Sequence, residues 1–277
     1  MINLNNFRQN IYSHVGLRPT PCYGEDGVLL KIFEEVRLTT SPTVVEFGEL
    51  RSLGATTRSI RIRYKAKSVY FSGTLDSRSK LLNVVDIFRV ALKFREIKYL
   101  KFLLNMPFQA WLSIGNFPKK LNALSGKSVD LVVVDIDSFD YEVVKEIIDS
   151  GIHPTCFVVE YNPSLPVDIP LYLSQVASKR PNLSPRVYGA SYAAWDDLFT
   201  SHGYQLVHVS GFCNLFYLKE SDAKLFEKPD IWSEVTDSNE KVLAFAEKWC
   251  LAGFRPSWLS SPALSTDDLH ILTQIKN

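Results

Sequence analysis

Leu131-Val132-Val133-Val134-Asp135-Ile136-Asp137 is an apolar, mostly β-branched run that ends in acidic residues. Such a short run is typical of a strand that is covered on both faces of a sheet. Residues 44–47 and 156–160 have the same character, and residues 141–148 place apolar side chains at helical spacing. Alternating strands and helices predict an α/β fold with a doubly wound, mostly parallel sheet.

Weaker patterns extend this sheet in both directions. Residues 69–71 and 110–114 are the weaker strand candidates. Near the end of the pattern, residues 204–209 and 214–218 flank Gly211, which predicts an antiparallel hairpin. The prediction is therefore a Rossmann-like sheet whose last strand runs antiparallel to the others.

Residues 61–67 allow two interpretations. Basic and apolar residues alternate there, and this period of two favours a strand. A doubly wound sheet requires a helix after the first strand, and Ile60 and Tyr64 have the i, i+4 spacing that permits one. We predict a helix.

The organisation along the chain follows from these patterns. A lead-in contains a predicted helix at residues 27–36, and the end of the chain contains a helix-like stretch at 239–251 before a Pro/Ser-rich tail at 256–266. The predicted units are a helical lead-in at 1–40, a Rossmann-like domain at 41–220 and a C-terminal extension at 221–277.

Composition excludes several classes of protein. The chain has 277 residues, of which 46% are hydrophobic and 22% charged, as expected for a globular and not a disordered or collagenous protein. Its cysteines are too widely spaced for a zinc site or a disulfide framework, and we expect them to be incidental thiols: Cys22, Cys156, Cys213 and Cys250. The N-terminus lacks a signal-peptide pattern, and no apolar run approaches ~20 residues, so we expect a cytoplasmic protein.

The formal net charge of +1 hides a strong asymmetry. Residues 51–101 contain 13 Lys and Arg against three Asp and Glu, a local charge of +10, while the rest of the chain carries −9. Such a segment can form a surface for an anionic partner. Two solvated helices with basic outer faces are an equally good interpretation.

Acidic residues follow three predicted strands. Glu46 and Gly48 come at the end of the first, and Glu160 and Asn162 at the end of the third. Open α/β sheets bind their ligands at this edge. A glycine after a strand allows close approach of a ligand, although a simple tight turn explains Gly48 as well.

The second strand leads into the densest acidic cluster, Asp135, Asp137 and Asp140. These carboxylates could bind a divalent metal, hold the positive end of a cofactor or deprotonate a hydroxyl. Alternatively, Asp137 or Asp140 caps the following helix. The sequence contains no Ser/His/Asp order, phosphate loop or metalloprotease helix, so it gives no support for a hydrolase or a nucleotide kinase.

Four stretches resemble the class I S-adenosylmethionine-dependent methyltransferases related to the FkbM type. They are Tyr23-Gly24-Glu25-Asp26-Gly27, Val45-Glu46-Phe47-Gly48, Val134-Asp135-Ile136-Asp137-Ser138-Phe139-Asp140-Tyr141 and Val158-Val159-Glu160-Tyr161-Asn162-Pro163. Later segments, including Asn214-Leu215-Phe216-Tyr217, are similar to the closing hairpin of that family. The resemblance covers residues 22–219 in family order.

The resemblance implies a Rossmann-like sheet with a reversed last strand and S-adenosylmethionine as the cofactor. It places Glu46 and Gly48 at the methionine side of the cofactor. Asp135 and Asp137 would face the sulfonium and the incoming nucleophile. We expect Glu160 and Asn162 on the substrate side, and we assign no metal.

The chain departs from the family at two loops. After Gly48 it reads Glu49-Leu50-Arg51 where the family has an acidic-Gly pair. Ser72 stands where an acid should bind the ribose hydroxyls, and Asp76 comes four residues late. Losing a charge-assisted hydrogen bond to the ribose would weaken cofactor binding by ~10–100-fold. Ser72 and Asp76 are the candidates for that contact.

The leading hypothesis is an O-methyltransferase that acts on a glycan or a small natural product, with Asp137 or Asp140 as the base. The divergent loops motivate an alternative, a degenerate fold that binds an anionic partner through residues 51–101. A metal-dependent glycosyltransferase is the third hypothesis, because Asp-x-Asp at a strand end also binds a metal ion with a sugar nucleotide.

Overall fold

The computed structural model describes eight parts of the chain: residues 1–8, 24–36, 41–48, 56–72, 109–111, 128–210, 214–231 and 262–275. Several predictions lie outside these residues. Among them are Asp76, the helix predicted at 239–251, most of the tail at 256–266, and three of the cysteines. Cys156 is a buried free thiol, as an incidental cysteine would be.

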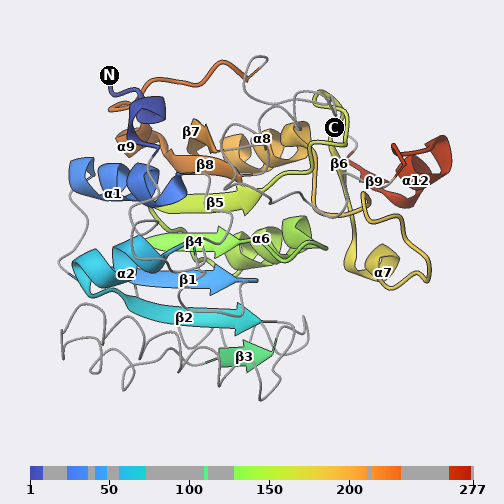
Figure 1. The fold of residues 1–277 in the computed structure, drawn as a ribbon, viewed down its shortest axis with the longest axis horizontal. Coiled ribbons are helices and arrows are strands. Elements are labelled where there is room, and N and C mark those ends of the chain that lie inside the picture. Colours follow the sequence, from blue (N-terminus) through green and yellow to red (C-terminus); the bar gives the residue numbers. More distant parts are fainter. Residues whose placement is uncertain are drawn as a thin grey trace.

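A seven-stranded sheet forms the centre of the molecule, in the order β3-β2-β1-β4-β5-β8-β7 (Figure 1). The strands are β1 Thr43–Phe47, β2 Lys67–Ser72, β3 Gln109–Trp111, β4 Leu131–Val134, β5 Cys156–Glu160, β7 Tyr204–Ser210 and β8 Asn214–Lys219. β1 to β5 pair in parallel, and β8 pairs antiparallel with both β5 and β7. The predicted fold class, including the reversed last strand, is confirmed.

Alternating side chains of the central strands enter two different cores. In β4, Val132 and Val134 belong to one core and Leu131 and Val133 to the other, because successive residues of a strand point to opposite faces. All four are at most 1% exposed. An apolar run without alternation is therefore what a strand covered on both faces requires.

Helices cover both faces of this sheet. The helices α6 (Asp140–Asp149) and α8 (Tyr192–Ser201) contribute to the first core, with Trp195 fully buried. On the other face lie α1 (Glu25–Glu35) and α2 (Arg58–Tyr64), which contribute side chains such as Phe33 and Ile60. The sheet is thus doubly wound, as predicted.

The ambiguous segment is helical where it follows β1. α2 ends at Tyr64, and Lys65 adopts a left-handed conformation with φ 53° that turns the chain into β2. The period of two in residues 61–67 was therefore misleading, since the helix was the correct prediction.

The strand predicted at 131–137 is shorter than expected. β4 ends at Val134, and Asp137 has a left-handed φ of 53°. Asp135 and Asp137 therefore lie beyond the strand, and the prediction of a strand up to Asp137 was wrong. They lie in the loop between β4 and α6, and Asp140 at the start of α6 accepts hydrogen bonds from this loop.

Short elements complete the described chain. β6 (Leu171–Tyr172) pairs antiparallel with β9 (Thr273–Gln274), so the last described residues are attached to the middle of the chain. A small third core joins these segments, with Leu165, Leu171 and Leu272 among its members. The other short helices are η1 Leu4–Phe7, α7 Gln175–Ser178, α9 Glu220–Ala223 and α12 Thr266–Ile271.

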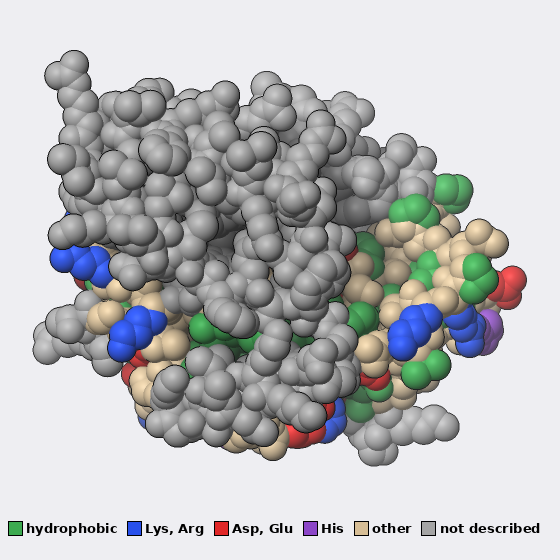
Figure 2. Space-filling model, turned by 90° about the horizontal axis from the view of Figure 1, so that it is seen from below, with side chains coloured by type: hydrophobic (Ala, Val, Ile, Leu, Met, Phe, Trp, Pro, Cys, Tyr) green, Lys and Arg blue, Asp and Glu red, His purple; other side chains and the backbone are tan. Residues whose placement is uncertain are grey.

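Charged side chains of both signs occur together on the described surface. On the face in Figure 2, Lys and Arg lie near acidic and hydrophobic side chains. Much of the basic segment at 51–101 lies outside the described residues, so its anionic partner stays a prediction. No helix in the described parts is long and apolar enough to cross a membrane.

Candidate functional site

Acidic side chains gather where β1, β4 and β5 end. These neighbouring parallel strands have their carboxyl ends at one edge of the sheet, which is where open α/β sheets bind ligands. The acids come from the strand ends, the loop after β4 and the first turns of α1 and α6: Glu25, Asp26, Glu46, Asp135, Asp137, Asp140 and Glu160. The edge is strongly electronegative.

Asp135, Asp137 and Glu160 form the centre of this cluster. Their carboxylate oxygens all lie within 4.8 Å of one another. Burial, and then repulsion by the neighbouring carboxylates, raises the pKa of Asp135 and of Glu160 well above the ordinary range. Burial also raises the pKa of the more exposed Asp137. Because charge is costly here, this trio favours a cation or shared protons.

Asp140 organises the loop after β4. Its carboxylate accepts hydrogen bonds from the backbone N–H of Ile136 at 2.8 Å and of Ser138 at 3.0 Å. The side chain is fully buried, and burial raises its pKa to about 6 against the lowering effect of these bonds. Asp140 therefore holds the loop before α6 and does not cap the helix, whose N-cap is Phe139 without a side-chain hydrogen bond, so the capping alternative was wrong for Asp140.

Glu46 organises the chain ahead of α2. The backbone N–H groups of Thr56 and Thr57 donate to its carboxylate at 2.8 and 3.2 Å, and the Thr57 hydroxyl donates to it as well. Glu46 is 2% exposed, so these contacts replace water at both oxygens. Glu46 therefore shapes the loop before α2, and its place beside a cofactor stays a prediction.

Gly48 follows β1 with φ 125°, a conformation that favours glycine. A Cβ at this position would overlap the backbone carbonyl oxygen of Asp135 and come within 2.6 Å of its carbonyl carbon. Backbone hydrogen bonds hold this approach, from Gly48 N–H to Phe71 at 2.9 Å and from Asp135 N–H to Phe47 at 3.0 Å. Glycine is required here because the backbone after β1 passes directly against the backbone after β4. The sequence analysis had suggested close approach of a ligand or a simple tight turn, and neither included this contact.

Asn162 connects two loops beside the acidic cluster. Its side-chain amide donates to the carbonyls of Arg186 at 2.7 Å and Tyr188 at 2.9 Å, and its Oδ1 accepts from Ser164 N–H at 2.8 Å. It is 1% exposed. These contacts give Asn162 a structural role, and its place on the substrate side stays a prediction.

The predicted ribose contact falls at the edge of the described structure. Ser72 is the last residue of β2 and lies opposite Trp111 of β3. Asp76 lies outside the described residues, as does the side-chain environment of Ser72. The choice between Ser72 and Asp76 therefore stays a prediction.

Glu25 is a member of the cluster that was not predicted as a site residue. It begins α1 and is 1% exposed, and burial raises its pKa to about 8, against the lowering effect of a hydrogen bond from Asn214. Asp26 and Glu46 raise the pKa further. Two adjacent acids at the start of the helix, Glu25 and Asp26, were the available signal in the sequence.

Stability is expected to fall as the pH rises. The ordinary pKa of Glu25 is 4.5 and its folded value is about 8, so the folded state binds more protons between these values. The stabilisation present at low pH is lost over this window, on the order of 5 kcal/mol for Glu25 at about 1.4 kcal/mol for each pKa unit. Glu25→Gln keeps an acceptor for Asn214. Urea unfolding at several pH values should show that the unfolding free energy of this variant depends less on pH than that of the wild type.

His208 sets the best pH range for this test. It is buried, and burial lowers its pKa, so its own effect on stability appears only as the pH falls below its ordinary value of 6.5. Measurements from about pH 7 upward therefore isolate the acids. If the unfolding free energy changed equally with pH in the wild type and in Glu25→Gln, the raised pKa of Glu25 would be contradicted.

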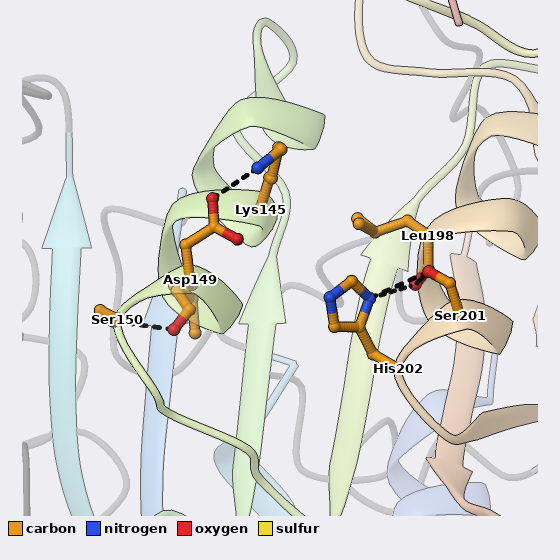
Figure 3. Close-up of polar contacts among 7 residues, drawn as sticks. Lys145, Asp149, Ser150, Leu198, Ser201 and His202 are labelled. Carbon is orange, nitrogen blue, oxygen red and sulfur yellow. Dashed lines mark hydrogen bonds and ion pairs between the residues drawn. The ribbon is translucent and has the colours of Figure 1, made fainter. Parts of the chain in front are cut away.

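The opposite edge of the sheet carries ordinary helix-end contacts (Figure 3). Near the end of α6, Lys145 pairs with Asp149 at 2.5 Å. Beyond α8, His202 Nδ1 lies 2.7 Å from the carbonyl oxygen of Leu198. These contacts lie at helix ends, so His202 is part of the C-terminal end of α8.

Comparisons with known proteins give only distant likenesses. No protein-family model matches the sequence, and no curated protein matches it. Its solved structural neighbours include methyltransferases. One is the calicheamicin methyltransferase CalS11, 12% identical, covering 78% of this chain and 82% of that chain with a TM-score of 0.45.

Two further structures have lower scores. Coclaurine N-methyltransferase bound to N-methylheliamine and SAH is 15% identical and covers 81% of this chain and 56% of that chain, with a TM-score of 0.38. MtNAS in complex with MTA and tNA is 13% identical and covers 78% of this chain and 68% of that chain, with a TM-score of 0.39. At such scores these likenesses do not define the activity or the substrate of this chain.

Proposed function

We propose that this protein is an S-adenosylmethionine-dependent methyltransferase that methylates a hydroxyl group on a glycan or a small natural product. The observation that carries the proposal is the sheet itself. β8 runs antiparallel between β5 and β7. This reversed strand is what the sequence resemblance implied, and a generic doubly wound sheet would not need it.

The residues at the sheet edge suit a cationic cofactor. A sulfonium and an α-ammonium are both positive, and this edge offers the buried carboxylates of Glu25 and Glu160 and the half-buried one of Asp135. When bound, S-adenosylmethionine supplies an electrophilic methyl group. We assign Asp135 to the cofactor side and Glu160 to the substrate side, while Glu46 and Gly48 shape the loops between which the cofactor would bind.

Asp137 is the proposed base. Methyl transfer is an in-line displacement, so the protein has to align the hydroxyl group and accept its proton. Asp137 is exposed to an incoming substrate and burial raises its pKa, which strengthens it as a base. Asp140 positions this loop because both of its oxygens are occupied by backbone N–H groups.

Asp137→Asn is expected to bind S-adenosylhomocysteine as the wild type does and to lose ~10²–10⁴-fold in methyl transfer. Calorimetry measures the binding, and release of S-adenosylhomocysteine over a panel of glycans and hydroxylated natural products measures the transfer. Asp149→Asn is the matched control, since Asp149 is exposed and at the other edge of the sheet. An Asp137→Asn variant with full activity would remove Asp137 from this role.

The cofactor itself provides the decisive test of the proposal. Absence of S-adenosylmethionine binding at millimolar concentration would overturn it. In that case the alternative of a non-catalytic binding module would predict salt-sensitive binding of an anionic partner. We retain that partner, and a cytoplasmic location, as predictions from the sequence.

A further inference from the structure

A divalent cation site is the feature of the acidic edge that a methyltransferase does not require. We propose that Asp135, Asp137 and Glu160 bind Mg²⁺ or Mn²⁺. The inference goes beyond the proposed function, because binding of the ion can be measured without any methyl donor or acceptor.

The three side chains lie near the spacing of metal ligands. One carboxylate oxygen from each lies within 4.8 Å of the other two. Two oxygen ligands of Mg²⁺, each about 2.0–2.1 Å from the ion, are at most about 4.2 Å apart. Small movements of the side chains would therefore bring all three carboxylates to one ion.

Glu160 provides the second observation that points to a ligand. The residue is 8% exposed, and its Oε2 has no hydrogen-bond partner within the described residues. An unsatisfied buried carboxylate oxygen is costly unless a cation or a proton compensates it. Because this oxygen belongs to the trio, an ion bound there would satisfy it.

The position of Glu160 is fixed by its neighbours. It is the last residue of β5 and pairs with Asn214 of β8. Trp195 Nε1–H also donates to its backbone carbonyl at 2.9 Å. A ligand on a rigid strand end holds its coordination geometry better than one on a loop.

The charge of the trio has no counterion among the described residues. In the described parts of the chain, none of the three carboxylates forms an ion pair with Lys or Arg. Burial and the neighbouring acids make this negative charge unfavourable. Carboxylates without His or Cys select hard cations such as Mg²⁺ and Mn²⁺.

The arrangement leaves part of the coordination sphere open. Asp137 is exposed, whereas Glu160 is buried, so the ion would be held from the protein side and accessible from solvent. Mg²⁺ ordinarily keeps several waters beside one or two carboxylates. A substrate hydroxyl could replace one of these waters and would then lie next to Asp137.

The test uses the full chain, stripped with EDTA and titrated with Mn²⁺ alone. Free Mn²⁺ is followed by electron paramagnetic resonance, and thermal unfolding is followed in parallel with Mn²⁺ and Mg²⁺. We expect one saturable Mn²⁺ site and a higher Tm with either ion. Asp137→Asn and Glu160→Gln should each weaken Mn²⁺ binding by about 100-fold or more.

Two controls separate a site from a general effect of charge. Asp149→Asn removes an exposed acid at the far edge and should leave Mn²⁺ binding unchanged. Without metal, Asp137→Asn and Glu160→Gln should unfold at or above the wild-type Tm, because each removes repulsion from the cluster. Loss of the metal-induced shift in variants that are still folded supports the site.

The proposal is overturned if the wild type shows no saturable Mn²⁺ binding, or if binding persists unchanged in both Asp137→Asn and Glu160→Gln. The methyltransferase proposal is tested separately, by S-adenosylmethionine binding in EDTA. Each proposal can therefore fail while the other holds.

Discussion

Replacing Gly48 by alanine is expected to destabilise the protein by about 3 kcal/mol or more. The added Cβ would overlap the backbone carbonyl of Asp135, which is not a flexible side chain that can move away. The φ of 125° adds strain for any residue with a Cβ. Since β1 and β4 meet at this point, the substitution should also disturb the acidic loop. Urea unfolding measures the loss.

Gly151→Ala is the matched control for this prediction. Gly151 has a φ of 80°, and no atom lies within 4 Å of the position of its Cβ. Only the left-handed backbone then opposes alanine, at about 1–2 kcal/mol. Equal losses for Gly48→Ala and Gly151→Ala would show that the contact with Asp135 is not what requires glycine.

Asn162→Ala is expected to cost about 3 kcal/mol of unfolding free energy. The substitution leaves two carbonyls, of Arg186 and Tyr188, and the Ser164 N–H without their partner. Each of these groups loses its hydrogen bond at a buried or half-buried position, where water replaces it poorly. Thermal unfolding and the urea midpoint should both shift.

Asn3→Ala tests whether burial, rather than the number of bonds, sets this cost. The Asn3 side chain also makes hydrogen bonds, to Glu227 and from the backbone N–H of Asn5, but it is exposed. We expect a loss of about 1 kcal/mol or less. If Asn162→Ala were equally mild, Asn162 would be available for the substrate contact that the sequence first suggested.

The strands could be predicted because their apolar side chains already indicate that both faces of the sheet are buried. Leu131 to Val134 form a short, mostly β-branched apolar run, and a sheet covered on both faces buries every member of such a segment. The reversed β8 was predictable as well, from two strand patterns on either side of Gly211. The end of β4 was not, because a left-handed residue such as Asp137 leaves no pattern in a single sequence.

The acidic residues illustrate the difference between position and role. Glu46, Asp135 and Glu160 could be assigned to one sheet edge because the carboxyl ends of parallel strands meet there. Their roles depend on partners far along the chain. The partners of Asn162 lie 24 and 26 residues away in sequence, and those of Glu46 lie in the next loop.

The sequence by itself determined the class of the fold and the edge at which acids collect, since both follow from residue patterns within single elements. Only the tertiary structure decided which acids are structural and which face the site. Asp140 bonds to its own loop, whereas Glu160 keeps a buried oxygen without a partner in the described chain. The physical reason is that hydrogen-bond satisfaction depends on packing between elements, which local patterns do not encode.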